Sequence, residues 1–218
     1  MAVRIEVERG LARFIPPIAE RLGLPINLEE TQPPDRPAKY ICVSLARSPH
    51  NQIVSYPAIV GSLRGRNYNF QLLKSDDRSA DLQSQSIALL QKRLGLCSAN
   101  FIFDESGRFL NEFPGLTRES LWTLEFAYTS HFENALRAAH DLPLGSVDLI
   151  KGPWYLLEFQ APSHLDMFKP YLHLFAHDPR YRIMKLSEFT GFVALAGDGD
   201  LISSAEHAVD YLEGIIDE

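Results

Sequence analysis

Two histidines spaced four residues apart are the side chains best placed for metal chemistry. A helix would put His173 and His177 on one face, beside Asp178. Such a pair can hold a metal ion. No glutamate stands where a zinc protease needs its base, and no third ligand is evident. Histidine near a helix C-terminus also interacts favourably with the helix dipole. We therefore expect an exposed helix face and no structural metal.

Two short glycine-containing loops could in principle bind anions. Residues 197–200 read Gly-Asp-Gly-Asp and precede a helix, where backbone N–H groups attract phosphate. The two aspartates would repel phosphate, so a capped tight turn is the better interpretation. Residues 61–66 form a small basic loop, for which an anion site and a solvated loop both remain open.

No arrangement of nucleophile and base is recognisable. Cys42 and Cys97 fit no metal-ligand spacing and have no base nearby in sequence, so we expect free thiols of a reducing compartment. Signatures of a catalytic serine, a phosphate-binding loop or a dinucleotide site are missing. We predict no catalytic residue and no cofactor. An enzyme with His131, His140 or His177 as its base is a third-ranked hypothesis.

Composition limits the classes of partner. The chain has 218 residues, of which 45% are hydrophobic, and a net charge of −7. A length of this order suits one large domain or two of about 100 residues. The acidic balance argues against nucleic acid. No apolar run approaches a membrane span and the N-terminus has no signal-peptide pattern, so we expect a cytoplasmic protein without membrane contact.

The elements suggest a duplicated fold. Residues 154–160, 162–178, 181–189, 192–196 and 200–215 predict strand, helix, strand, strand and helix. Residues 38–96 show a similar order, with a helix starting at Ser48-Pro49, at an offset of about 115–119 positions. Strands at 121–126 and 146–150, a helix at 130–139 and an N-cap at Asp200 are also expected. We therefore predict an α+β protein with two tandem ferredoxin-like β-α-β-β-α domains, 1–113 and 114–218, each an antiparallel sheet with helices on one face.

This block order resembles a known family. Trp154-Tyr-Leu-Leu-Glu-Phe-Gln-Ala, the hairpin around Thr190-Gly191 and the helix from Asp200 are similar to bacterial microcompartment shell domains, in particular the circularly permuted tandem proteins of carboxysomes. The resemblance implies a non-enzymatic shell subunit in a cytoplasmic microcompartment. Three chains would close a pseudohexameric ring with a central metabolite pore, and other shell proteins would be the partners.

The resemblance also implies which residues line the pore. Where the carboxysome proteins carry a charged gating pair, this chain has Phe70-Gln71-Leu72, which departs from the pattern. The pore loops would be two hairpin turns, and their expected lining residues are Lys74, Ser75, Asp76, Ser187, Glu188 and Thr190.

A second function class remains open. Duplicated ferredoxin-like domains also serve as small-molecule-binding, sensor or accessory modules, with a ligand between the copies. Residues 61–66 and the aromatic residues between 101 and 132 would then form the site.

Overall fold

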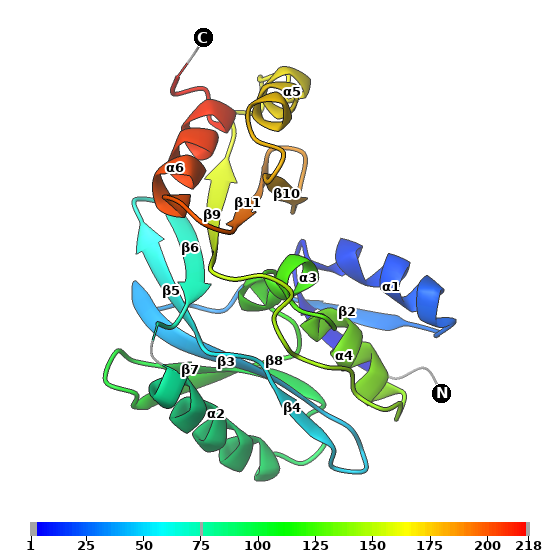
Figure 1. The fold of residues 1–218 in the computed structure, drawn as a ribbon. Coiled ribbons are helices and arrows are strands. Elements are labelled where there is room, and N and C mark those ends of the chain that lie inside the picture. The colour runs from blue at the N-terminus through cyan, green and yellow to red at the C-terminus, as the bar shows by residue number, and fades with distance from the viewer. Residues whose placement is uncertain (1–3, 75, 217–218) are drawn as a thin grey trace.

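One long antiparallel sheet runs through the molecule (Figure 1). The computed structural model describes residues 4–74 and 76–216. The strands of this sheet are β3 (Lys39–Arg47), β4 (Ile53–Ser55), β5 (Ile59–Arg64), β6 (Asn67–Leu72), β7 (Ser98–Phe103), β8 (Phe109–Pro114), β9 (Trp154–Gln160), β10 (Arg182–Lys185) and β11 (Thr190–Ala196). Within the described residues their order is β10-β11-β9-β6-β5-β3-β7-β8, with β4 paired to β3.

The central strands are covered on both faces. β3 and β7 are nearly continuous buried runs, as strands enclosed by two layers are. Helix α2 (Asp76–Gln91) lies on one face, where Leu82 and Leu90 join a core with Val43 and Phe101. The opposite face is covered by η2 (Arg118–Ser120), α3 (Thr123–Phe126) and α4 (His131–Ala139), together with an N-terminal unit (Figure 1).

The N-terminal unit is a small β-α-β motif. Strands β1 (Arg4–Glu8) and β2 (Asn27–Thr31) pair in parallel, and η1 (Ala12–Phe14) and α1 (Ile15–Leu22) connect them. Pro16 and Pro17 fall in the first turn of α1, where the missing N–H is not needed. Gly23 ends the helix with φ of 66°, the left-handed conformation that glycine adopts readily.

The C-terminal lobe consists of β9, α5 (Phe168–His177), β10, β11 and α6 (Leu201–Leu212). Its own core includes Phe159, Leu195 and Leu212. Strand β6 pairs with β9 in antiparallel orientation, with Asn69 opposite Leu157 and Gln71 opposite Tyr155. The sheet of the larger part therefore continues directly into this lobe. Figure 1 shows α5 and α6 on the part of the molecule far from α2.

Several predicted elements are confirmed. The strand predicted at 154–160 is β9, and the helix predicted at 130–139 is α4. The predicted N-cap of the last helix is also confirmed, because the Asp200 carboxylate accepts a hydrogen bond from Ser203 N at 3.1 Å.

The predicted tandem fold is wrong. The helix expected after Ser48 does not form, and β4 and β5 occupy that stretch instead. Pro57 interrupts a helical pattern there, while the pairs Ile53-Val54 and Ile59-Val60 are β-branched and favour strands. The first half is therefore a meander followed by one helix and does not repeat the β9-α5-β10-β11-α6 order. The domain boundary predicted between residues 113 and 114 falls within β8, and it stays a prediction.

The predictions of two more strands are wrong, and side-chain packing explains the first of them. Residues 121–126 form a turn and the short helix α3, and residues 146–150 make only an isolated bridge, Ala127 to Leu149. Trp122 and Phe126 are four residues apart, so a helical turn places both rings against Trp154. Burial of three aromatic rings together favours the turn over the strand.

No helix among the described residues is both long and apolar enough to cross a membrane.

Candidate functional site

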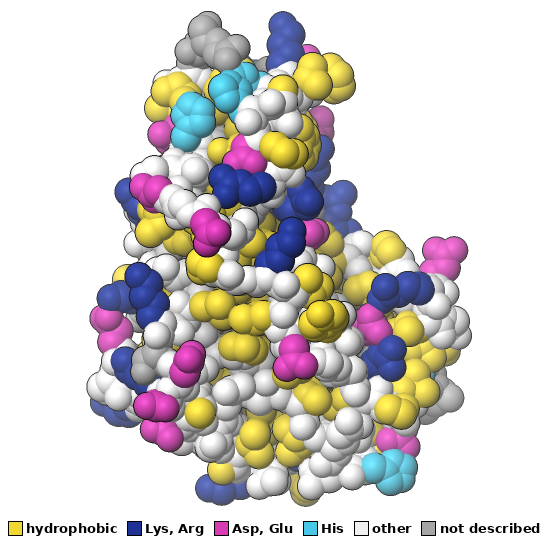
Figure 2. Space-filling view, viewed as in Figure 1, with side chains coloured by type: hydrophobic (Ala, Val, Ile, Leu, Met, Phe, Trp, Pro, Cys, Tyr) yellow, Lys and Arg dark blue, Asp and Glu magenta, His cyan; other side chains and the backbone are white. Residues whose placement is uncertain are grey.

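A cleft lies where the end of β6, the start of α2 and the segment before β9 meet. We call it the waist cleft. Its volume is about 520 Å³. A side pocket of about 290 Å³ adjoins it and shares residues 71–74. Figure 2 shows hydrophobic side chains gathered at the middle of this face, between the part carrying α5 and α6 and the part carrying α2. The waist cleft is lined by Gln71, Leu72, Leu73, Lys74, Asp76, Leu149, Gly152, Pro153 and Trp154.

Trp154 is the buried aromatic residue of the waist cleft. Its ring stacks with Trp122 at a centroid distance of 4.9 Å and with Phe126 at 5.8 Å, both at an interplanar angle of 16°. The indole Nε1–H is buried and has no hydrogen-bond partner among residues 4–74 and 76–216. Buried donors are normally satisfied, so this one is unusual.

The charges around the waist cleft nearly balance. Lys74 and Asp76 are exposed at its edge. In the side pocket Lys39 pairs with the carboxylate of Glu105, and Arg78 donates to the Glu105 carbonyl. Two of the three cations are thus already engaged, so the cleft is not a strongly basic site.

A buried ionic network lies on the face of the sheet that is opposite α2. Arg36 donates from Nε to Glu119 Oε1 at 2.6 Å and also contacts Glu8, and the Tyr40 hydroxyl donates to Glu119 at 2.6 Å. Arg36, Glu8 and Glu119 are all almost completely buried. Burial would raise the pKa of Glu119, but the charge and hydrogen bonds of Arg36, with those of Thr117 and Tyr40, lower it to about 2.

The network extends to the C-terminal lobe through Arg118. This guanidinium donates to Glu8 Oε1 at 2.9 Å and to Glu158 Oε1 at 3.0 Å, and Glu158 accepts from Tyr68 N at 3.0 Å. The charged side chains of this network, which are mostly buried, therefore connect β1, η2, β6 and β9. Because the side chains of Arg36, Glu8 and Glu119 are almost completely buried, we interpret the network as a structural frame.

A buried histidine and serine form a pair that the sequence did not reveal. His131 Nε2 lies 2.9 Å from the Leu45 carbonyl, which can only accept, so Nε2 carries the proton. The Ser120 hydroxyl therefore donates to His131 Nδ1 at 2.7 Å. Burial lowers the pKa of His131 to about 4. The imidazole is fully buried, so no substrate reaches it and its role as a general base is excluded in this conformation. Residues from separate elements meet here, and no spacing signals it.

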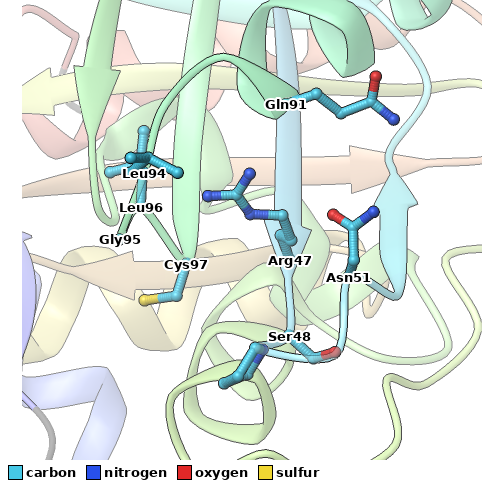
Figure 3. A pocket seen from close by; sticks show the side chains of 9 residues that line it. Arg47, Ser48, Asn51, Gln91, Leu94, Gly95, Leu96 and Cys97 are labelled. Carbon is cyan, nitrogen blue, oxygen red and sulfur yellow. The ribbon is translucent and has the colours of Figure 1, made fainter.

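A third pocket, of about 420 Å³, lies at the carboxyl end of α2. Arg47 points across it toward residues 94–97 (Figure 3) and donates from Nη1 to the Leu90 carbonyl at 2.9 Å. This contact satisfies a helix-terminal carbonyl. Burial raises the pKa of the Cys97 thiol, so the thiol stays protonated at neutral pH and is a poor nucleophile.

The predicted pore residues do not come together. Lys74 and Asp76 line the waist cleft, at the Trp154 end of β9. Thr190 pairs with Gln160 at the other end of that strand, about 20 Å away at the rise of a β-strand. Ser187 and Glu188 are exposed in the same turn as Thr190, and Ser75 lies outside the described residues.

The histidine pair and the basic loop have local roles. The His173 and His177 rings are 4.4 Å apart on α5, and His173 stacks on Tyr211 at 4.1 Å. No group of three or more His, Cys, Asp or Glu in the described part of the chain is arranged to hold a metal, and the prediction of no structural metal stays a prediction. Arg64 and Arg66 of the basic loop pair with Glu206 and Glu213.

Comparison with known proteins identifies the fold. No protein-family model matches the chain. A stretch of 58 residues, 26% of this chain, is 47% identical to the N5-carboxyaminoimidazole ribonucleotide synthase of Aquifex aeolicus, of which it covers 16%. The solved synthetase of Thermotoga maritima has a TM-score of 0.64 at 18% identity over 79% of this chain and 51% of its own.

Other solved structures agree. The synthase of Aspergillus clavatus, in complex with ADP and 5-aminoimidazole ribonucleotide, has a TM-score of 0.65 at 15% identity, covering 81% of this chain and 51% of its own. The phosphoribosylaminoimidazole carboxylase ATPase subunit of Aquifex aeolicus has a TM-score of 0.61 at 20% identity, covering 85% and 58%. The chain thus shares the fold of about half of each of these proteins.

These comparisons correct the shell interpretation. The proteins that share this fold are synthetases, which are enzymes, so the predictions of a non-enzymatic shell subunit, a pore-forming homotrimer, other shell proteins as partners and a microcompartment location are wrong. The alternative of a duplicated ferredoxin-like binding module is wrong as well.

Proposed function

We propose that this chain acts in an ATP-dependent carboxylation of an aminoimidazole ribonucleotide. The observation that carries the proposal is that a local sequence match and the likeness of fold lead to the same class of protein. The 58-residue stretch is 47% identical to a synthase from Aquifex aeolicus, and an ATPase subunit from that organism resembles the chain over 85% of its length. One relative of this fold holds both ADP and 5-aminoimidazole ribonucleotide.

The chain would contribute a rigid frame and a ligand cleft to this reaction. The continuous sheet from β8 to β10 and the ion pair between Arg118 and Glu158 connect the two lobes. The waist cleft has a volume in the range of small-molecule sites, about 300–1,000 Å³. The chain spans about half the length of the relatives it matches, so its share of the full reaction is itself part of the proposal.

The experiment measures ADP release by the purified chain given magnesium ATP, bicarbonate and 5-aminoimidazole ribonucleotide. We expect ADP formation that depends on the ribonucleotide, because an ATP-consuming carboxylation couples the two. A chain denatured by heat is the blank, and the same mixture without ribonucleotide is the control. ADP release that is equal with and without ribonucleotide, or no release from chain with a cooperative unfolding transition, would contradict the proposal.

A further inference from the structure

Helix α5 exposes three large apolar side chains on one side. Phe168, Leu172 and Phe175 are 69%, 60% and 47% exposed. Leu172 follows Phe168 by four residues and precedes Phe175 by three, so the three side chains form one stripe along the helix. Figure 2 shows hydrophobic side chains at the end of the molecule that carries α5 and α6 in Figure 1. We call these three residues the α5 stripe.

The opposite side of α5 is apolar as well. Leu174 is buried in the core of the C-terminal lobe, and Tyr171 packs against that core. A helix on a protein surface normally has a polar outer face, whereas a helix with apolar residues on all sides is normally buried. Exposed apolar residues need no explanation when they are single, but a contiguous patch marks an interaction surface. We therefore expect another molecule to cover the α5 stripe.

The spacing of the α5 stripe makes it complementary to itself. Leu172 lies near its middle, with one phenylalanine toward each end. If two copies of α5 pack in antiparallel orientation about a twofold axis at Leu172, Phe168 of each copy lies beside Phe175 of the other. Such a contact uses the same patch on both subunits and is complete with two of them.

The charges on α5 favour the same orientation. Lys169 is exposed in the first turn, and the helix contains no other Lys, Arg, Asp or Glu. A cation at this position is unfavourable for its own helix, because the N-terminal end of the helix dipole is positive. In an antiparallel pair, Lys169 lies near the carboxyl-terminal turn of the other copy, where the dipole is negative. The two lysines also lie at opposite ends of the contact.

The size of the α5 stripe sets the affinity to be expected. Four phenylalanine rings, two from each copy, can bury at most about 1,000 Å². Including Leu172, the interface is near the lower limit of about 1,000–1,200 Å² for a specific complex, where association is weak and transient. We expect a dissociation constant of about 10–100 μM, because even larger interfaces range down to micromolar affinity.

We propose that the α5 stripe is the contact surface of a weak twofold homodimer, in which Leu172 packs against Leu172 of a second copy. The inference goes beyond the proposed function and does not depend on it. Dimer formation needs neither ATP nor ribonucleotide, so its test is separate from the measurement of ADP release.

The first test measures mass by sedimentation velocity for wild type, Leu172→Glu and Leu94→Glu. The wild type should rise from the 24.6 kDa chain mass toward twice that value as its concentration passes about 10–100 μM. Leu172→Glu should weaken association at least about tenfold, because it brings two carboxylates together in an apolar contact. Leu94 is 97% exposed just after α2, so Leu94→Glu makes the same change outside the stripe and should associate like the wild type.

The second test examines the twofold geometry by disulfide formation under mild oxidation. Leu172→Cys should give a covalent dimer, because the axis brings the two cysteines together. Phe168→Cys alone and Phe175→Cys alone should not, whereas a mixture of these two variants should. The wild type, which contains Cys42 and Cys97, measures the background. Circular dichroism shows that each variant is folded.

Three results would overturn the inference. The first is a wild type that stays monomeric above about 100 μM, which would leave the stripe to another occupant, such as the half of its relatives' length that this chain does not span. The second is a dimer that Leu172→Glu and Leu94→Glu affect equally. The third is a Phe168→Cys variant that crosslinks by itself as well as Leu172→Cys does.

Discussion

At the scale of single residues, we expect substitution of Arg36 to lower the stability of the fold strongly. Its guanidinium is 3% exposed and faces the fully buried Glu119 and the nearly buried Glu8. Removing it would leave two carboxylates buried without their main counter-charge. The cost of an uncompensated buried charge exceeds what the intact pair contributes.

We predict that Arg36→Ala lowers the free energy of unfolding by about 3–5 kcal/mol. Urea denaturation followed by circular dichroism measures it. Arg13→Ala is the matched control, since Arg13 is exposed and donates to the Lys185 carbonyl at 3.2 Å. The control should change stability by less than about 0.5 kcal/mol. A similar small effect for both variants would show that the network is not a stabilising frame.

His131 makes stability depend on pH. Its pKa is lowered from 6.5 in the unfolded chain to about 4 in the fold, mainly by burial. Between these values the unfolded chain binds more protons, so stability falls as pH drops from about 6.5 toward 4. The Glu119 carboxyl, with a pKa lowered to about 2, adds a further loss only below its usual value of 4.5.

We therefore predict that the wild type loses about 2 kcal/mol of stability from this histidine between pH 7 and pH 5. In His131→Asn that part of the slope should vanish, whatever the absolute stability of the variant. Urea unfolding at both pH values gives the slopes, and His50→Asn, which changes an exposed histidine paired with Asp141, is the control. Equal slopes for wild type and His131→Asn would contradict the burial argument.

At the scale of elements, caps place α4 and with it His131. The Ser130 hydroxyl accepts from Glu133 N at 3.1 Å, the N-cap contact of a Ser-x-x-Glu capping box. We predict that Ser130→Ala lowers the free energy of unfolding by about 1 kcal/mol. Ser84→Ala on α2, whose hydroxyl donates back to the Ala80 carbonyl at 2.9 Å, should have almost no effect. Equal losses measured by thermal unfolding would argue against a capping role.

Local patterns predicted some elements and missed others. The strand β9 and the capped helices α4 and α6 follow from alternation, period and caps that lie within each segment. The strands β4 and β5 were missed because their side chains also fit a helical spacing. β4 pairs with β3, and β5 pairs with β3 and β6. Such pairing joins separate segments of the chain, and the periodicity within one segment does not predict it.

At the scale of the whole molecule, the same limitation explains the shell interpretation. The order strand-helix-strand-strand-helix in the C-terminal lobe is shared by unrelated folds. What distinguishes this fold is that β6 joins β9 and makes one sheet of both lobes. Lys74 and Asp76 were predicted as pore residues because of their place in a hairpin turn. The pairing of β6 with β9 brings Leu149 and Trp154 to the same cleft, and the sequence did not predict this pairing.

We propose above that this chain, which spans about half the length of its relatives, takes part in carboxylating an aminoimidazole ribonucleotide. The most direct test follows carbon-13 from labelled bicarbonate by NMR, with purified chain, magnesium ATP and 5-aminoimidazole ribonucleotide. We expect a new carboxyl resonance on the ribonucleotide that requires both ATP and folded chain. Label that stays in bicarbonate, under conditions where the Aquifex aeolicus synthase transfers it, would contradict the proposed function.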